Sequence, residues 1–358
     1  MPTLENMDKE RHLFLVHSFA TYRCSLGVIE HQNLELESCI IVTDRGFTCS
    51  DLPKGISTGT ISSLGSPNIN SVKRVLKQRL GLSRRDREIN ELLGWHKFHC
   101  YIPHTYYDFA HLIVSHPKCT GFSYIEEGLT SYYKPGEIDK AYEPWSFESR
   151  VRLLRAIFYG SRLVNQVFFY SNNYKAVYGF CESSFPDWQN KVVLGVDKLF
   201  PRKSAQKLPH HPVLVFDALV ELGRTSADSL CAALKQFLYD CKVNGVSELS
   251  FKLHPSQTKE QSISYVRSIL LPCSFIKVQE MPQFVCLEDI FCDYALTVFI
   301  FNSASGVYAA LSGNNVYSLN SYIEKEDREY SETLGRLPRV YNHLVKPYKS
   351  SIQYSGNS

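Results

Sequence analysis

The sequence predicts an α/β protein of two domains of similar size, each built around a mostly parallel β-sheet. The chain has 358 residues, enough for about two domains of roughly 150 residues each. Short continuous apolar runs, the first at 13–16, alternate with helical patterns, as strands buried on both faces of a parallel sheet do. This alternation stops in a segment rich in Ser, Pro, Lys and His at 201–212 and then starts again. The restart predicts a second domain.

The first domain is expected to span residues 1–185. Its opening predicts a β-α-β unit, with strands at 13–16 and 39–43 and a helix at 20–32 between them. Residues 50–70, rich in Ser, Gly, Pro and Asn, predict a loop. The further elements expected are a basic helix at 71–95, a strand at 98–102, a helix at 106–114, a strand at 122–125 and a helix at 146–170.

A linker at 186–212 is expected to lead into the second domain at 213–325. The strands expected there are 213–216, 249–253, 274–278, 295–301 and 316–319, with helices at 225–244, 259–270, near Leu287 and at 306–313. A charged C-terminal tail, 326–358, remains, and whether it returns to the first domain stays open. Ligands of parallel sheets bind outside the carboxyl ends of the strands, so we expect the site in a cleft between the two domains.

Composition excludes several classes of protein. With 44% hydrophobic and 21% charged residues the chain is neither disordered nor collagen-like nor a coiled coil. A net charge of +3 is too mild to indicate nucleic-acid binding. Eleven cysteines without a C-x-x-C pair argue against a zinc knuckle and indicate a reducing compartment. No stretch approaches the roughly 18 apolar residues of a membrane span, and the N-terminus is no signal peptide, so we expect a cytoplasmic protein.

Two adjacent carboxylates and a glycine, Glu126, Glu127 and Gly128, end the strand at 122–125. A carboxylate at a strand end is placed to act as a general base on a hydroxyl, and the glycine allows a tight turn. Neighbouring side chains in an extended segment point to opposite sides, so one acid is expected to face the site while the other anchors the loop. The alternative is a solvated acidic turn.

The second domain offers a histidine and an anion site at its strand ends. In the sequence KLHP, from Lys252 to Pro255, proline holds His254 in an extended conformation, from which it could donate a proton to an anionic leaving group. Ser303 and Ser305 stand at the start of a helix, an arrangement suited to phosphate. Glu288 could accept two hydroxyls of a ribose. The alternatives are a surface histidine, a plain serine N-cap and an acid that complements the helix dipole.

The order of these motifs resembles that of the bacterial sialyltransferases, specifically the lipooligosaccharide sialyltransferases and capsule polysialyltransferases. The counterparts are EEG at 126–128, KLHP at 252–255 and NSAS at 302–305. The opening segment LFLVHSFATYRCSLGVIE is similar to the first β-α unit of that group, and the likeness spans roughly residues 12–320. The second hydroxyl of the family's last motif falls on Ala304 here, unless Ser305 replaces it.

The resemblance implies a GT-B fold of two Rossmann-like domains and an inverting transfer of sialic acid from CMP-sialic acid to a hydroxyl of a lipooligosaccharide or capsule glycan. It implies Glu126 as the general base, with Glu127 and Gly128 supporting. His254 would act on the donor phosphate as general acid or charge stabiliser, supported by Lys252 and Pro255. Ser303 and Ser305, next to Asn302, would hold that phosphate, and Glu288 the ribose. Neither a metal nor another cofactor is expected.

Acceptor contacts are predicted on two further segments of the first domain. Tyr132 and Tyr133 follow the acid-acid-glycine motif and could line an acceptor pocket, the alternative being core packing. A stretch with seven cations over 73–87, including Arg84 and Arg85, could contact an anionic acceptor or an anionic membrane surface, the alternative being a solvated helix face. Nucleic acid is not expected as a partner. A CMP-Kdo-dependent transferase and a non-catalytic protein that binds glycan or nucleotide remain the alternative functions.

Overall fold

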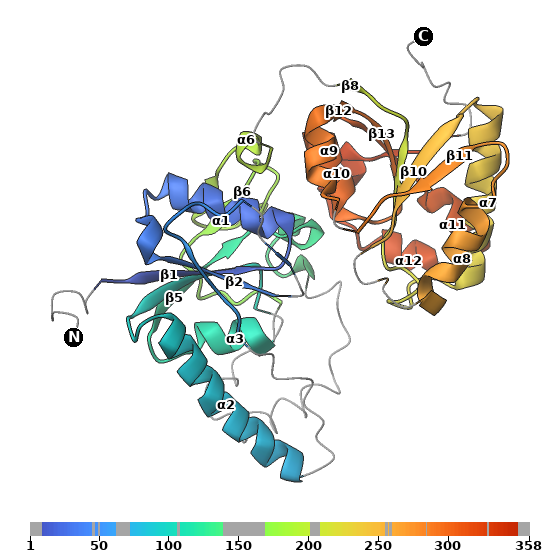
Figure 1. Cartoon of the computed structure of the whole chain (residues 1–358). Coiled ribbons are helices and arrows are strands. Elements are labelled where there is room, and N and C mark those ends of the chain that lie inside the picture. The colour runs from blue at the N-terminus through green and yellow to red at the C-terminus, as the bar shows by residue number, and fades with distance from the viewer. Residues whose placement is uncertain are drawn as a thin grey trace. The chain divides into compact units, whose positions relative to one another are not determined.

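The computed structural model describes residues 9–44, 47–48, 51–61, 72–105, 108–138, 169–200, 208–254, 257, 260–283, 285–327 and 329–349. The chain divides into two compact units between Leu199 and Phe200, and each unit is described by itself (Figure 1). Among the described residues, no helix combines the length and the apolar character that crossing a membrane requires.

The first unit is a twisted parallel sheet with helices on both faces. Its strands are β1 (Arg11–Val16), β2 (Cys39–Thr43), β3 (Ser57–Gly59), β4 (Phe98–Ile102), β5 (Cys119–Ile125), β6 (Val177–Gly179) and β7 (Lys191–Val193). They lie in the order β3-β2-β1-β4-β5-β6-β7, and every described pairing is parallel. Its helices are α1 (Phe19–His31), α2 (Val72–Leu92), α3 (Asp108–Val114) and α6 (Val196–Leu199), with 3₁₀ turns η2 (Leu36–Ser38) and η3 (Leu129–Tyr132). Figure 1 shows α1 on one face of this sheet and α2 and α3 on the other.

The second unit repeats this design. Its main sheet contains β9 (Val213–Val215), β10 (Glu248–Lys252), β11 (Lys277–Glu280), β13 (Thr297–Ile300), β14 (Asn315–Ser318) and β15 (Lys346–Pro347), in the order β11-β10-β9-β13-β14-β15. A separate pair joins β8 (Leu208–Pro209) to β12 (Tyr294–Ala295). The helices are α7 (Ala227–Val243), α8 (Glu260–Leu270), α9 (Leu287–Asp293), α10 (Ala304–Leu311), α11 (Asn320–Glu326), α12 (Tyr330–Leu334) and α13 (Arg339–Leu344).

The strand order of the two main sheets is the same when the strands of each main sheet are numbered along the chain, which leaves out the separate pair β8 and β12. Both begin 3-2-1-4-5-6, the order of the doubly wound Rossmann fold, in which ligands bind where the order reverses, between the first and fourth strands. This switch point lies between β1 and β4 in the first unit and between β9 and β13 in the second. The carboxyl ends of these strands are therefore where ligand-binding residues are expected.

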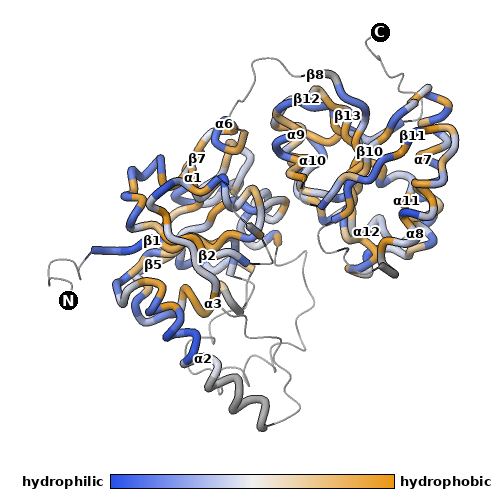
Figure 2. The backbone as a smooth tube through the Cα atoms, viewed as in Figure 1, coloured by the Kyte–Doolittle hydropathy of each residue, from blue (hydrophilic) through white to orange (hydrophobic). Residues whose placement is uncertain are grey.

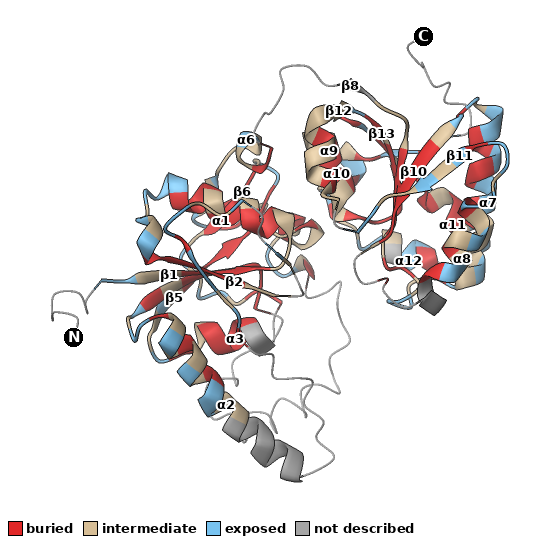
Figure 3. Cartoon of the chain, in the orientation of Figure 1, coloured by how far each residue is buried: buried red, intermediate tan, exposed pale blue. Residues whose placement is uncertain are grey.

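The central strands form because their apolar residues are buried on both faces. Ile40, Ile41 and Val42 of β2 are each at most 1% exposed, and β-branched residues suit such strands. Figure 2 shows that the hydrophobic residues concentrate in the central strands and the facing sides of the helices, and Figure 3 shows the same segments as buried. The prediction of two domains with parallel sheets is confirmed.

Several boundaries differ from those predicted. The first unit continues beyond residue 185, because β7 pairs with β6. The predicted tail joins the second sheet through β15, whose Lys346 pairs with Tyr317, so the second unit extends well past residue 325. The predicted loop 50–70 contains β3, and the strand predicted at 274–278 runs from Lys277 to Glu280. These short, polar edge strands lack the apolar runs by which buried strands are recognised. The helix predicted at 146–170 lies almost wholly outside the described residues.

Candidate functional site

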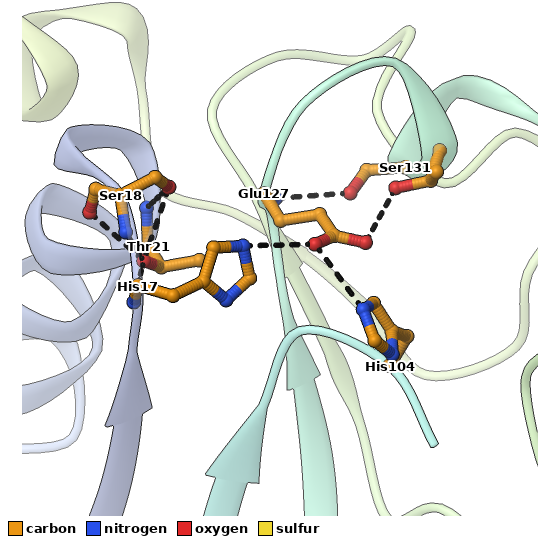
Figure 4. A network of polar contacts seen from close by, with 7 residues as sticks. His17, Ser18, Thr21, His104, Glu127 and Ser131 are labelled. Atoms are coloured by element: carbon orange, nitrogen blue, oxygen red, sulfur yellow. Dashed lines mark hydrogen bonds and ion pairs between the residues drawn. The ribbon is translucent and has the colours of Figure 1, made fainter. Parts of the chain in front are cut away.

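Polar side chains meet at the switch point of the first unit. His17 directly follows β1, His104 follows β4 by two residues, and Glu127 follows β5 by two residues. Because β1, β4 and β5 are neighbours in the sheet, the three side chains converge, as Figure 4 shows. His17 Nε2 lies 3.1 Å and His104 Nε2 3.6 Å from Glu127 Oε2. We call these three residues the Glu127 cluster.

Local capping fixes the backbone on both sides of the Glu127 cluster. Ser18 is the N-cap of α1 and forms a capping box with Thr21, whose hydroxyl also accepts a 3.1 Å hydrogen bond from the His17 N–H. Gly128 has φ 151 and ψ −148, a conformation essentially restricted to glycine, and it turns the chain into η3. The Thr130 hydroxyl then donates to Glu127 Oε1 at 2.6 Å.

The surroundings of Glu127 keep its carboxylate charged. The side chains of His17, His104 and Glu127 are 7%, 3% and 8% exposed. Burial would raise the pKa of Glu127, but the charge of His104, the hydrogen bond and charge of His17 and the hydrogen bond from Thr130 together lower it to about 2. Glu127 is therefore ionised at neutral pH and is itself a weak base.

Glu126, the residue expected to be the general base, lies in the interior. It is fully buried, and its two carboxylate oxygens accept three hydrogen bonds. The Tyr132 hydroxyl donates to Oε1 at 2.6 Å, while the Ser184 hydroxyl and the Phe180 N–H donate to Oε2 at 2.6 and 2.8 Å. The segment 180–184 can approach this closely because residue 179 is a glycine. In the structure Glu126 thus anchors this loop, and Glu127 lies in the cluster at the strand ends.

The predicted acceptor residues make their described contacts inside the first unit. Tyr132 is buried with its hydroxyl on Glu126, and the Tyr133 carbonyl accepts a 3.0 Å hydrogen bond from the indole of Trp188. On α2, Arg84 pairs with Glu88 at 2.9 Å, and buried Arg85 donates to the Gly81 carbonyl at 2.8 Å. The side chains of 73–80 in the basic stretch lie outside the described residues. Acceptor binding by these residues stays a prediction.

In the second unit, the KLHP segment is fixed by the loops beside it. The buried ammonium of Lys252 donates to the carbonyls of Pro282 and Gln283 at 3.1 and 3.0 Å. The His254 N–H donates to Gln257 Oε1 at 2.9 Å, and the Gln257 N–H returns a bond to the His254 carbonyl, also at 2.9 Å. Lys252 therefore joins β10 to the loop after β11, and His254 has a fixed backbone. Pro255 lies outside the described residues.

A second acid stands beside His254 on the neighbouring strand. Val215 of β9 is paired with Lys252 of β10, and Asp217 and His254 each follow two residues later. Burial raises the pKa of Asp217, and the charges of His254 and Arg224 partly oppose that rise. The carboxyl end of β9 thus supplies an acidic group that interacts electrostatically with the predicted catalytic histidine.

The hydroxyl residues after β13 begin α10. Ser303 is the N-cap, and its hydroxyl accepts a 3.3 Å hydrogen bond from the Ser305 N–H. Buried Asn302 donates through Nδ2 to the Tyr330 hydroxyl and accepts from Asn320 Nδ2, both at 2.8 Å. The Asn302 amide thereby ties the end of β13 to α11 and α12. Ser303 and Ser305 at the helix start remain the predicted phosphate ligands.

Glu288, the predicted ribose ligand, lies in the first turn of α9. The Cys286 thiol donates to its Oε2 at 3.2 Å, and burial raises the pKa of Glu288. The charge of Glu288 also acts on Lys252, raising the pKa that burial of the ammonium lowers. Within the described part of the chain, no group of three or more His, Cys, Asp or Glu residues is arranged to hold a metal ion.

His17, His104 and Asp217 were not among the residues predicted from the sequence. Each follows a strand that the sequence does predict, at the edge where ligands of parallel sheets bind. Applying this rule to every strand end would have found them. The acid-acid-glycine, KLHP and serine motifs follow other strands, β5, β10 and β13, and so do not include these three residues.

Comparison with known proteins identifies the fold. The sequence matches no protein-family model and no curated protein. The S. aureus MnaA–UDP structure aligns over 95% of this chain and 92% of its own, with 10% identity and a TM-score of 0.50. A UDP-GlcNAc 2-epimerase from Methanocaldococcus jannaschii, in complex with UDP-GlcNAc and UDP, aligns over 98% of this chain and 96% of its own, with 11% identity and a TM-score of 0.50. The predicted GT-B fold of two Rossmann-like domains is confirmed.

Proposed function

We propose that this protein is an inverting, metal-independent glycosyltransferase that moves sialic acid from CMP-sialic acid to a hydroxyl of a bacterial lipooligosaccharide or capsule glycan. The observation that carries this proposal is the position of the three sequence motifs. The acid-acid-glycine, KLHP and serine segments each follow a strand at the carboxyl edge of a Rossmann sheet, where the fold binds ligands.

The second unit is proposed to bind the donor. Ser303 and Ser305 at the N-terminus of α10 offer hydroxyls and backbone N–H groups to the phosphate. His254 acts on the phosphate oxygen that leaves with CMP, as a general acid or as a charge stabiliser. Glu288 accepts the ribose hydroxyls, and Lys252 holds the loop 282–283 in place beside them. These groups supply the neutralisation for which other transferases use a metal ion.

The first unit is proposed to bind the acceptor and to remove the proton from its hydroxyl. Its acid-acid-glycine segment supplies the negative charge that this proton transfer needs, and the family likeness implies Glu126 as the general base. The basic stretch of α2 would draw the anionic glycan or an anionic membrane surface toward this unit. We propose the cytoplasm as the place of action, because the proposed CMP-sugar donor would be available there.

A UDP-sugar is the second candidate for the donor. Both similar structures described above contain UDP, and one also contains UDP-GlcNAc. Their identity to this chain is 10–11%, so the likeness supports a nucleotide-sugar site in general. CMP rests on the motif likeness alone.

A thermal-shift comparison of CMP, UDP and GDP, followed by an assay of CMP release, tests the proposed function. A ligand at a hundred times its Kd stabilises the folded state by about 2.7 kcal/mol, which is easily measured as a rise in Tm. We expect CMP to raise the Tm, and CMP release from CMP-sialic acid to depend on a galactoside or sialoside acceptor. Stabilisation by UDP without any by CMP would contradict the CMP-sialic acid assignment and favour the UDP-sugar alternative.

A further inference from the structure

We propose that His17, oriented by Glu127, is the group that accepts the proton of the acceptor hydroxyl, and that Glu126 has a structural role. This inference rests on the proposed function and identifies the catalytic base within it. It departs from the family likeness, which implies the first acid of the motif.

The contacts of Glu126 argue against its acting as the base. A general base must lie within hydrogen-bond reach of the proton it removes. The Glu126 carboxylate is fully buried and accepts from Tyr132, Ser184 and the Phe180 N–H at 2.6–2.8 Å. To reach a sugar hydroxyl it would have to leave three donors unsatisfied in the interior, which is strongly unfavourable.

Glu127 lies at the strand ends but is itself a poor proton acceptor. Its Oε2 faces His17 and His104 at 3.1 and 3.6 Å, and its Oε1 accepts from the Thr130 hydroxyl at 2.6 Å. These neighbours lower its pKa to about 2, so a proton on Glu127 would be far less stable than one on an ordinary carboxylate. A carboxylate of this kind is well suited to hold an imidazole and to stabilise it when it becomes charged. That is the part a carboxylate plays beside histidine in catalytic triads.

His17 has the geometry of the partner in such a pair. Its Nε2 lies 3.1 Å from Glu127 Oε2, and because a carboxylate oxygen only accepts, the hydrogen belongs on Nε2 and the neutral form of the ring has its lone pair on Nδ1. The hydrogen bond to Glu127 thereby fixes the tautomer in which Nδ1 can accept a proton. Since His17 lies between the end of β1 and the N-terminus of α1, it is at the switch point of the sheet (Figure 4).

His104 is placed to support this pair. Its Nε2 is 3.6 Å from Glu127 Oε2, a distance longer than that of a hydrogen bond. The centroid of its ring lies 4.7 Å from the centroid of the Phe169 ring. The next residue, Thr105, is tied by backbone and side-chain bonds to the Phe169 carbonyl. His104 is thus held against the core, and its main described effect is to lower the pKa of Glu127.

The proposed step is a single displacement. The acceptor oxygen forms a bond to the anomeric carbon of sialic acid while the bond from that carbon to the phosphate oxygen breaks, and CMP leaves with the electron pair. The hydroxyl proton passes to His17 Nδ1, and Glu127 stabilises the imidazolium that results. His17 then releases the proton to water.

The test compares His17→Gln with wild type, using a sugar acceptor and azide as alternative nucleophiles for CMP-sialic acid. Removing a general base lowers kcat by about 10²–10⁴-fold. We therefore expect that loss with the sugar acceptor, with an unchanged donor KM and an unchanged Tm shift by CMP. Azide carries no proton, so sialyl transfer to azide should proceed equally well in the variant. A misfolded variant would lose both reactions and the response to CMP.

Matched variants separate the alternatives. His99→Gln serves as the control, because His99 lies near the amino end of β4, away from the carboxyl ends of the strands, and its Nε2 contacts the Ser123 hydroxyl at 2.9 Å. His17→Ala should show the same loss as His17→Gln if proton transfer is what is removed. Sugar transfer by His17→Gln within a few-fold of wild type would overturn the inference. An equal loss of azide transfer in a variant that still responds to CMP would also overturn it, as would a selective loss of sugar transfer in Glu126→Gln with none in His17→Gln.

The proposed function and the assignment of His17 fail in different ways. If the wild-type protein transfers sialic acid neither to sugars nor to azide, and CMP does not change its Tm, the donor assignment is wrong and the role of His17 falls with it. If wild type is active and the His17 variants are active too, the transferase function stands and only the catalytic role of His17 is wrong.

Discussion

The buried carboxylate of Glu126 provides a stability prediction that is independent of any substrate. Glu126→Ala leaves the Tyr132 and Ser184 hydroxyls and the Phe180 N–H without their common acceptor. The hydroxyls can rotate toward other partners, but the backbone N–H cannot. A buried donor left without a partner costs about 1–3 kcal/mol, so three such donors, two of them partly satisfied elsewhere, should cost about 3–5 kcal/mol in total.

Glu126→Gln should cost much less. The amide has the same shape, so its oxygen can accept from Phe180 and Ser184 while its nitrogen donates to the Tyr132 hydroxyl oxygen. We expect a loss of about 1 kcal/mol, within the usual range for one altered hydrogen bond. The free energies of unfolding of the two variants should therefore differ by several kcal/mol.

Urea unfolding followed by tryptophan fluorescence measures this difference in the first unit alone. All three tryptophans of the chain, Trp95, Trp145 and Trp188, precede residue 199. With a slope of about 2 kcal/mol per molar urea, a loss of about 4 kcal/mol lowers the midpoint by about 2 M. The control is Glu182→Ala, since Glu182 is 85% exposed in its pair with Lys191 and such pairs contribute about 0–1 kcal/mol. Equal urea midpoints for Glu126→Ala and Glu126→Gln would refute the assigned role of the three hydrogen bonds to Glu126.

Three further predictions concern the same strand ends. Gly179→Ala should destabilise the first unit by about 1–3 kcal/mol, because a Cβ there would lie 2.3 Å from Ser184 Cβ; an unchanged urea midpoint would contradict this. Gly128→Ala should cost a similar amount, about 1–3 kcal/mol, because φ 151 is a glycine conformation, and its loss should appear in the same tryptophan signal. The pKa of Glu127 falls from 4.5 to about 2 on folding, so its contribution to stability is present above pH 4.5 and is lost as the pH falls through 2. The stability gap between wild type and Glu127→Gln should therefore shrink by about 3 kcal/mol over that range, and a gap independent of pH would argue against the ion pairs.

Much of the fold could be predicted from the sequence, because its central strands carry their own signal. Apolar runs such as 39–43 and 213–216 are short and rich in β-branched residues, which favours strands of a parallel sheet, and in the structure they are almost wholly buried. The edge strands β7 and β15 were not predicted, since they are only three and two residues long and begin with Lys191 and Lys346. Those strands exist because a neighbouring strand offers hydrogen bonds, which is information the local sequence does not contain.

The two parallel-sheet domains and the strand ends that carry polar motifs could be predicted from the amino-acid sequence alone. It also predicted that one of two adjacent acids would face the site and the other would anchor a loop, since neighbouring side chains in an extended segment point apart. That Glu126 is the acid that anchors the loop depends on tertiary packing, because its partners Ser184 and Phe180 come from a loop more than fifty residues away. The same holds for His17 and Glu127, which meet because the order of strands in the sheet, rather than their order in the chain, determines which strand ends are neighbours.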